Sequence, residues 1–304
     1  MALSTKKFLQ AIGLGGGTNL GELTDTTPST NIDALVGMAA GYPEPLFSSI
    51  RAIRPDVRFS TVQLTDFFTA INAGTPPFCA DQSAGNTDLW YQDSANKASR
   101  TSSASLLHQR FRMAKAFLLW TRINARHRED ATVDARLKPV WDGSNVPIVA
   151  AGTLALTITP VATQRYTMGQ VEINGVTLAG VQEWTLDSGL KIDEEGSEGE
   201  VYDSFAGIES TGPVFEITGR TIEWWNTYGL GTALTNITAF LIAKGPVGNV
   251  AAGTTSHIKV VGTSGLIAPV QTQGIKSSTK LRVYVQAPDA THNSLTITTG
   301  VAIT

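Results

Sequence analysis

The chain has 304 residues, a formal net charge of −3 and a sequence pI of about 5.8. This length can bury a large core and can hold one large domain or two. Proteins that grip nucleic acid by its phosphates are normally more basic, so the charge argues against that class. Charged residues make up only 16% of the chain. With its many Thr, Val and Gly residues, the sequence predicts a mainly β protein with a weakly charged surface.

Sequence motifs for enzymatic chemistry are absent. The chain has no GxSxG, no Walker A loop and no HExxH, and its four histidines are scattered. Its single cysteine, Cys79, cannot form an intrachain disulfide and is expected to be partly buried. We therefore expect no enzyme and no cofactor. The longest apolar run, residues 146–158, is too short to span a membrane, so a soluble protein made in a cytoplasm is expected.

Residues 1–95 predict an arm or loop region with short helices. Helical patterns cover residues 4–12 and 31–40, and the Gly-rich stretch GLGGGTNLGELTDTTPST between them is typical of a flexible arm. The strongest helix prediction is TVQLTDFFTAINAG, residues 61–74, with Ser60 or Thr61 as its cap and Gly74 as its end. One apolar stripe along this helix is formed by Leu64, Phe67, Phe68 and Ile71.

Residues 96–304 predict a β-rich domain, because apolar side chains alternate with polar ones from about residue 105 onward. In WTRINARHRE, this alternation places Trp120 on the same face as the arginines that follow it. An amphipathic helix over residues 104–118 is an alternative. Asn174-Gly175 is a strong hairpin signal. The regular spacing of the later strands favours a sandwich or barrel over a parallel sheet with helices.

The stretch LKIDEEGSEGEVYDSF contains six carboxylates within eleven positions: Asp193, Glu194, Glu195, Glu198, Glu200 and Asp203. A calcium site would use several of these oxygens, but their order does not fit the EF-hand loop. A glycosidase would need two acids facing each other from separate strands, which one acidic loop does not supply. The remaining interpretations are a solvated charged loop and a surface selected to be negative.

A basic stretch contrasts with this acidic one. Residues 97–128 contain eight Lys or Arg and no Asp or Glu. Two oppositely charged surfaces could pair head to tail between subunits, which generates rings or open stacks. The alternative is that the basic strands pair with acids of the same chain. The candidate interface arginines are Arg110, Arg112, Arg122, Arg126 and Arg128.

Two adjacent tryptophans, Trp224 and Trp225, form a second candidate surface. In a strand, neighbouring side chains point to opposite faces. We therefore expect one tryptophan in the core and the other at a subunit interface. A stacking platform for sugars, completed by Tyr228, is the alternative.

Residues 166–219, YTMGQVEINGVTLAGVQEWTLDSGLKIDEEGSEGEVYDSFAGIESTGPVFEITG, resemble bacteriophage tail tube (major tail) proteins. The likeness is in the pattern: a strand, an Asn-Gly turn, a strand ending in Gly, an acidic loop and a Pro-led strand. FSTVQLTDFF and ARLKPVWDGSNVP are also similar to such proteins. No counterpart is identified for residues 1–95.

This resemblance implies a tail-tube-like β-barrel or sandwich with a short flanking helix and an irregular N-terminal arm. It implies a virion protein, made in the host cytoplasm, whose hexameric rings stack into a tube. The implied partners are other copies of the chain, the tape-measure and other tail proteins, and double-stranded DNA that passes through without specific binding. Because DNA is densely negative, we expect the acidic stretch to face the lumen or the contact between rings. Alternatives are the tube of a contractile injection system and a glycan-binding surface protein.

Overall fold

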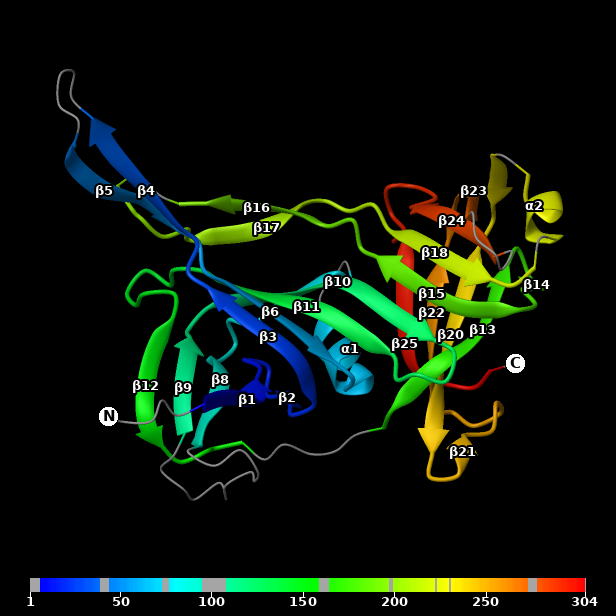
Figure 1. The fold of residues 1–304 in the computed structure, drawn as a ribbon, viewed down its shortest axis with the longest axis horizontal. Helices are drawn as coiled ribbons and strands as arrows, with labels where there is room; N and C mark the ends of the chain where they lie inside the picture. The colour runs from blue at the N-terminus through cyan, green and yellow to red at the C-terminus, as the bar shows by residue number, and fades with distance from the viewer. Residues whose placement is uncertain are drawn as a thin grey trace.

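A computed structural model describes residues 6–38, 44–72, 77–94, 108–158, 164–196, 199–221, 223–229, 231–272 and 278–303. The protein is mainly β, as its composition predicts, with three antiparallel sheets and two separate two-stranded ribbons (Figure 1). The sheets pack on one another in a sandwich-like arrangement. Over the described ranges, no sheet closes into a barrel. No helix in these ranges is long and apolar enough to cross a membrane.

The largest sheet has ten strands and runs across the molecule. Its strands in spatial order are β19 (Thr232–Leu234), β23 (Ser264–Thr272), β24 (Ser278–Gln286), β18 (Val214–Gly219), β15 (Val181–Asp187), β10 (Ala116–Arg126), β11 (Thr132–Pro139), β6 (Asp56–Thr61) and β3 (Leu23–Ser29), with β7 (Cys79–Asp81) paired to β10. Buried and exposed side chains alternate along its strands, and the buried ones form the core face of the sheet. In β18, for example, Phe215 and Ile217 are fully buried while Glu216 between them is not.

Two smaller sheets flank it. The six-stranded sheet has the order β14 (Val176–Thr177), β13 (Tyr166–Ile173), β20 (Ile237–Gly245), β22 (His257–Gly262) and β25 (Leu295–Val301), with β21 (Gly248–Asn249) paired to β20. The five-stranded sheet has the order β12 (Val149–Leu154), β9 (His108–Met113), β8 (Thr87–Ser94), β1 (Lys6–Gly13) and β2 (Asn19–Leu20). One buried cluster, from Ile12 to Ile297, includes side chains of all three sheets.

The predicted helix is confirmed as α1 (Leu64–Asn72), and all four side chains of its apolar stripe are buried. The chain turns into the helix through Thr61, whose hydroxyl accepts the Gln63 N–H at 3.1 Å. The Gln63 side-chain amide in turn donates to the Asp66 carboxylate in the first turn at 3.1 Å. At the other end, Asn72 donates to the Ile297 carbonyl and fixes α1 to β25. Gly74 lies outside the described residues.

The two other helices predicted for the N-terminal region are wrong. Residues 6–13 form β1, which pairs with β8, and residues 32–38 form β4 (Ile32–Met38), which pairs with β5 (Pro45–Ile53). Apolar residues at helical spacing are also compatible with a strand, and pairing with another strand decided between the two. Asn31, at φ +42°, turns the chain from β3 into β4.

The Gly-rich stretch is part of the fold and does not form an arm. A Cβ at Gly15 would lie 2.2 Å from the Gln82 carbonyl oxygen, so only glycine allows the two backbones to approach this closely. The Gly15 N–H donates to the Thr87 hydroxyl. β3 and β6 belong to the same sheet as β10 and β24. The expected domain boundary at residue 95 falls in the undescribed range 95–107, and strands on both sides of it share sheets.

A bulge in β10 changes one predicted face. The register shifts between Trp120 and Arg122, with Thr121 as the extra residue. Trp120 therefore points into the core with Ile123 and Ala125, whereas strict alternation placed it with the arginines. Residues 108–113 form the strand β9, so the helical alternative for that segment is wrong. The Asn174-Gly175 hairpin is confirmed, with φ angles of +53° and +78°.

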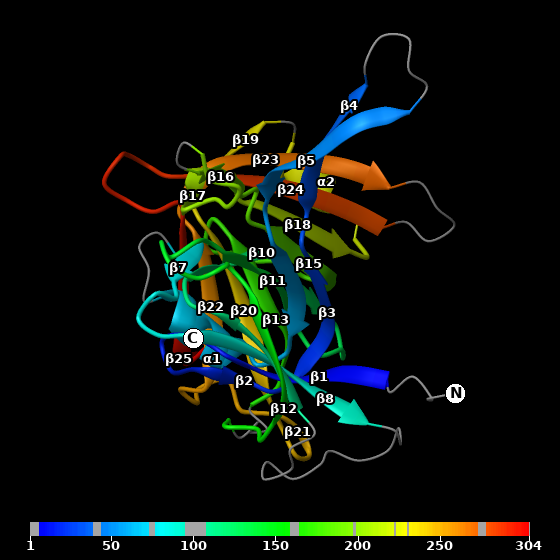
Figure 2. The ribbon, with the colours of Figure 1, turned by 90° about the vertical axis from the view of Figure 1, so that its left-hand side faces the viewer.

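Two long hairpins extend beyond the ten-stranded sheet. β3 and β6 continue as the β4–β5 ribbon, and β15 and β18 continue as the ribbon of β16 (Lys191–Glu195) and β17 (Phe205–Ser210). Figures 1 and 2 show the β4–β5 ribbon projecting from the body of the molecule. The two hairpins meet near its base, where Ile53 forms a bridge with Tyr202 and its N–H donates to the Val201 carbonyl at 2.6 Å.

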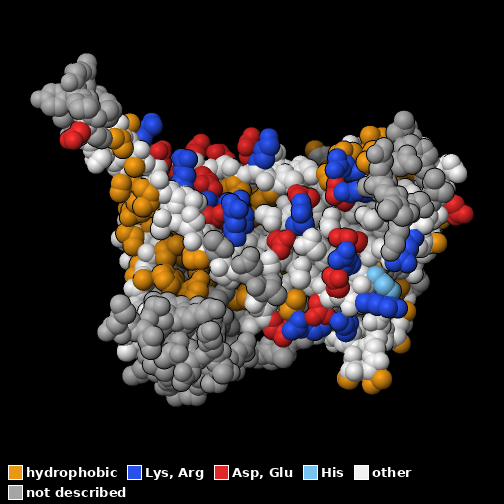
Figure 3. All heavy atoms as spheres, in the orientation of Figure 1, with side chains coloured by type: hydrophobic (Ala, Val, Ile, Leu, Met, Phe, Trp, Pro, Cys, Tyr) orange, Lys and Arg blue, Asp and Glu red, His pale blue; other side chains and the backbone are white. Residues whose placement is uncertain are grey.

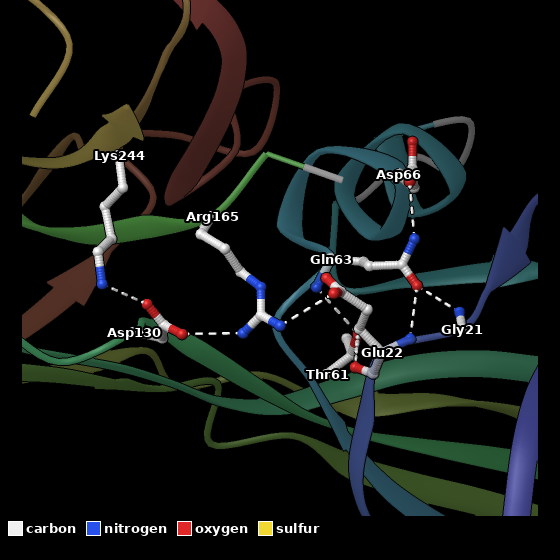
Figure 4. Close-up of polar contacts among 8 residues, drawn as sticks. All are labelled: Gly21, Glu22, Thr61, Gln63, Asp66, Asp130, Arg165 and Lys244. Atoms are coloured by element: carbon white, nitrogen blue, oxygen red, sulfur yellow. Dashed lines mark hydrogen bonds and ion pairs between the residues drawn. The ribbon is translucent and has the colours of Figure 1, made fainter. Parts of the chain in front are cut away.

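An ion-pair network joins the six-stranded sheet to the ten-stranded one (Figure 4). Lys244 of β20 contacts Asp130, in the β10–β11 connection, at 2.6 Å. Arg165 bridges Asp130 at 2.8 Å and Glu22 at 2.9 Å. The Glu22 backbone N–H donates to the Gln63 side chain at 2.8 Å, next to α1. The network therefore fixes how the sheets and the helix sit against each other.

The bend in the second hairpin depends on Gly189, which has a φ of +57° and approaches Gly212. A Cβ at Gly189 would lie 2.2 Å from the Gly212 carbonyl oxygen. Gly189→Ala is therefore expected to lower the free energy of unfolding by about 3 kcal/mol, through left-handed strain and the clash together. Chemical denaturation measures the loss. The control Gly143→Ala has a φ of +93° with open space around it, so it should cost about 1–2 kcal/mol. Equal losses in the two variants would contradict the role of the close approach.

Candidate functional site

One face of the ten-stranded sheet is exposed and hollowed. A basin of about 840 Å³ lies over β3, β6, β11, β10 and β15, and a hollow of about 320 Å³ continues over β15, β18 and β24. Arg122 and Asp187 line both, so the two hollows adjoin at these residues. Figure 3 shows Lys and Arg interleaved with Asp and Glu over the middle of the molecule. We call this surface the charged face.

The charges of this face alternate from strand to strand in register. Arg122 of β10 lies opposite Asp134 of β11 on one side and opposite Asp187 of β15 on the other. Its guanidinium contacts the Asp187 carboxylate at 3.0 Å. Asp134 in turn accepts hydrogen bonds from the Ser60 hydroxyl at 2.5 Å and from the Asn124 amide at 3.0 Å. Directly opposed opposite charges stabilise a sheet, so this register is electrostatically favourable.

Asp56 is the most buried carboxylate of the face, with only 2% of its surface exposed. Arg136 binds it with two hydrogen bonds, at 2.9 and 3.1 Å, and Arg58 adds a third at 3.1 Å. Burial by itself would raise the pKa of the Asp56 carboxyl, but the hydrogen bonds and charge of Arg136, aided by Arg58, lower it below the ordinary value. Asp56 is therefore held as an anion.

A second carboxylate, Glu216 of β18, is held between two cations of β24. Lys280 and Arg282 contact its two oxygens, and Arg282 lies directly opposite it in the register. The hydrogen bond from Lys280 and then that from Arg282 lower the pKa of the Glu216 carboxyl. A general acid near neutral pH needs a raised carboxyl pKa, so the environments of Asp56 and Glu216 favour ion pairing over acid catalysis.

The structure places four of the five predicted interface arginines in contact with acids of the same chain. Arg112 binds Asp88 of β8 with two hydrogen bonds of 2.8 Å, and Arg110 lies 3.9 Å from the same carboxylate, over the Trp90 ring. Arg122 pairs with Asp187, as described above. Two acids lie near the Arg126 guanidinium: Glu129 at 3.3 Å and Glu183 at 3.7 Å. Arg128 is an exposed turn residue with a φ of +69°. Pairing within the chain was the alternative interpretation, and a role in subunit contacts stays a prediction.

Half of the six acids in the acidic stretch lie in a strand, although the sequence suggested a loop. Asp193, Glu194 and Glu195 lie in β16, and Glu194 contacts the buried Lys138 Nζ at 2.6 Å. Asp193 and Glu195 are exposed. Asp203 is nearly buried, and its side chain binds Arg54 at 3.1 Å at the base of the β4–β5 ribbon.

Of the two remaining acids, only Glu200 lies within the described residues. Glu200 is half-buried, and Glu198 lies outside the described residues. Two of the six predicted carboxylates therefore bind cations of the same chain instead of forming a free negative surface.

The adjacent tryptophans lie in a short helix, α2 (Glu223–Thr227), so the strand prediction for them is wrong. The Trp224 ring is 4% exposed and packs against Gly219, where a Cβ would lie 2.1 Å from it. Tyr228 is 5% exposed. A sugar cannot stack on rings this deeply buried, which argues against the glycan platform. The side chain of Trp225 lies outside what the structure describes.

The sequence patterns do not single out the carboxylates that organise the charged face, namely Asp56, Asp134, Asp187 and Glu216. A signal did exist, because the alternation of ATVDARLKPV places Asp134 and Arg136 on one face of a strand. Ser60 and Asp56, which bind Asp134 and Arg136, come from β6, more than 70 residues away in the sequence, and only the register brings them together.

The comparisons do not assign the chain to a family. No protein-family model matches the sequence, and no curated protein matches it. Within the described ranges, no group of three His, Cys, Asp or Glu side chains is arranged to hold a metal ion. The charged face is therefore interpreted from its own geometry.

Asp56→Asn tests whether the ion pairs of the charged face stabilise the fold. The lowered carboxyl pKa means that Asp56 contributes stability above about pH 4, which is lost as pH falls through the folded-state pKa. At pH 7 the variant is expected to be less stable by about 2–3 kcal/mol, because Arg136 and Arg58 lose their anion. Chemical denaturation between pH 7 and pH 3 should show that the difference in free energy of unfolding between the wild type and the variant shrinks as pH falls. Asp33→Asn, at an exposed position of β4, is the control and should change stability by less than about 0.5 kcal/mol. A constant difference across this pH range would contradict the proposed linkage.

Proposed function

We propose that the chain is a structural subunit that self-assembles into stacked rings forming a phage tail tube, a conduit for genome delivery. The observation that carries the proposal is the charged face: a broad, hollowed surface of a large antiparallel sheet, on which cations and carboxylates of neighbouring strands pair in register. The sequence resemblance of residues 166–219 to tail tube proteins supports it. That segment contributes β15 and β18, two central strands of this sheet.

The charged face suits a surface past which DNA slides. A protein grips DNA when free Lys and Arg neutralise phosphates and release counterions. Here the cations Arg136, Arg122 and Arg282 already contact carboxylates. Exchanging a carboxylate for a phosphate would release few counterions, so the gain in binding is small. Such a face stays hydrated without holding the duplex.

The lumen expected from the sequence was negative, whereas the charged face is close to neutral. Its acids are Asp56, Asp134, Glu183, Asp187 and Glu216. Its bases are Arg58, Arg122, Arg126, Arg136, Lys280 and Arg282. We therefore assign low friction on DNA to paired charges on the sheet, and not to the acidic stretch. Asp193 and Glu195, on the β16–β17 ribbon, remain candidates for a negative rim or a contact between rings.

The sheet edges and ribbons support self-assembly. Among the described residues, the ten-stranded sheet ends at β3 and at the three-residue strand β19, and each end leaves one backbone edge without a strand partner. Proteins either protect such edges or use them for pairing with another chain. In a ring, edges of neighbouring subunits can pair with each other, and no edge is then left open for non-specific pairing with other chains. The same geometry would serve an injection-system tube, which differs in its cargo.

Negative-stain electron microscopy of the concentrated protein tests the assembly. We expect rings, or tubes with a central channel, whose formation is insensitive to a calcium chelator because no metal is part of the proposed contact. Size-exclusion chromatography in the same buffers gives the mass of the smallest unit. Dispersed monomers at the highest attainable concentration would contradict the tube function.

Fluorescence anisotropy with a labelled DNA duplex tests the neutralised face. The wild-type protein is expected not to bind at about 0.15 M salt. The triple variant Asp134→Asn, Asp187→Asn and Glu216→Gln leaves arginines without their anions, and should bind at least 10-fold more tightly, with an affinity that falls steeply as salt rises.

The matched control removes the same three charges elsewhere: Asp33→Asn, Glu44→Gln and Glu209→Gln, all at exposed positions of the two ribbons. This control should not bind. Equal binding by both triple variants would mean that net charge matters and the paired arrangement does not. Tight binding by the wild type would contradict the sliding surface.

A further inference from the structure

The β4–β5 ribbon exposes several large apolar side chains to solvent. Ile32, Val36 and Ile50 are between 48% and 53% exposed. Ile32 and Val36 alternate along β4, and Ile50 lies opposite Ala34 between them, so all three share one face of the ribbon. The bulge at Arg51 keeps Ile53 on that face as well, opposite Ile32. We call this surface the arm face.

The other side of the ribbon is also apolar. Phe47 is 57% exposed, and its ring lies over Gly37, where a Cβ would be 1.9 Å away. The base of the ribbon is fixed, because Ile53 and Arg54 bind the second hairpin. Two-stranded hairpins are marginally stable alone and normally need a packed face. We therefore expect the arm face to pack against another surface.

The apolar character of this end of the molecule extends beyond the ribbon. β12 ends the five-stranded sheet, and its sequence VAAGTL contains no charge. Val149 of β12 and Val146 just before it are both more than 40% exposed. Figure 3 shows hydrophobic side chains continuing from the arm down this end of the molecule. A continuous apolar surface of this kind is typical of a protein contact.

A matching apolar surface lies on the same chain at the opposite end of the charged face. Leu266, Val270 and Tyr284 are between 40% and 44% exposed. Leu266 lies directly opposite Tyr284 in the register, and Val270 shares their face of β23. We call this surface the strip. Figure 1 places β23 and β24 at one end of the long axis and the β4–β5 ribbon at the other.

We propose that the arm face of one subunit docks on the strip of a second copy of this chain. The two surfaces differ and lie at opposite ends of the molecule. A reciprocal two-fold dimer would satisfy both surfaces with one partner and would stop at two copies, whereas the proposed tube requires a head-to-tail arrangement with a different neighbour on each surface. The contact is then heterologous and propagates from copy to copy, which closes a ring or extends a stack. This contact rests on the proposed function, because it names a surface by which tube subunits would meet.

Glutamate substitutions on each surface test the contact by analytical ultracentrifugation. The arm variant is Val36→Glu with Ile50→Glu, and the strip variant is Leu266→Glu with Val270→Glu. Each should fail to form the wild-type assembly, with at least a 10-fold higher concentration needed, because a buried carboxylate opposes docking. The control, Val176→Glu with Val247→Glu, introduces the same charge at exposed positions on neither surface and should assemble normally. Circular dichroism melts establish that all variants fold.

Mixing the two variants gives the decisive readout. The arm variant keeps an intact strip and the strip variant keeps an intact arm, so an equimolar mixture can form one good contact and then stops. We expect the mass of the smaller unit to double and to grow no further. A mixture that stays at the smaller unit, or a strip variant that assembles like the control, would overturn the contact.

The outcome for the tube is separate from the outcome for the contact. Channel-bearing tubes formed equally well by the arm variant would uphold the tube and overturn the docking. Arm-dependent oligomers without a channel in electron micrographs would uphold the docking and contradict the tube function. A wild-type protein that remains monomeric at every concentration would overturn both.

Discussion

The in-register pairing of arginine with carboxylate across the ten-stranded sheet is the constraint on which the rest of the structure depends. The face is exposed and hollowed, yet Asp56 within it is almost completely buried and is tolerated there because Arg136 and Arg58 satisfy it. The same register places Arg122 between two aspartates and Glu216 opposite Arg282. A shift by one residue would turn these charges into the core, so the electrostatics and the packing select the same register.

Strands of this sheet also continue into both hairpins, and the bends in these hairpins direct the two ribbons away from the sheet. Gly189 and Gly212 let two backbones touch where β15 and β18 become the second ribbon, and Asn31 adopts a left-handed conformation where β3 becomes β4. The hairpins then hold each other through Ile53 and the Arg54–Asp203 pair. The acidic stretch consequently has a partly structural role. It anchors the arm, and this leaves the apolar side chains of the arm directed outward.

In the proposed tube, the charged face would line the conduit, and the apolar surfaces at the two ends of the molecule would contact other subunits. The strip lies on the same side of the sheet as the charged face, and Tyr284 lines the smaller hollow. Self-association through the arm face and the strip would therefore cover that end of the charged face and leave the basin over β3, β6, β11 and β10 open. A conduit needs this separation, since its inner wall must be wetted while its subunits adhere. The network of Lys244, Asp130, Arg165 and Glu22 fixes the six-stranded sheet against the ten-stranded one.

The sequence by itself determined what local chemistry controls. Alternation predicted a mainly β chain, the apolar stripe predicted α1, and Asn174-Gly175 predicted its hairpin. It could not decide segments where local and distant preferences conflict. Residues 6–13 and 32–38 have helical spacing but form strands, because β8 and β5 offer backbone partners. A bulge at Thr121 moved Trp120 to the other face, and α2 replaced the strand expected at Trp224.

Most of the candidate site was decided only by the tertiary structure. The charges of Asp56, Asp134 and Glu216 are visible in the sequence, but their partners are set by the register between strands up to 80 residues apart, which no local pattern encodes.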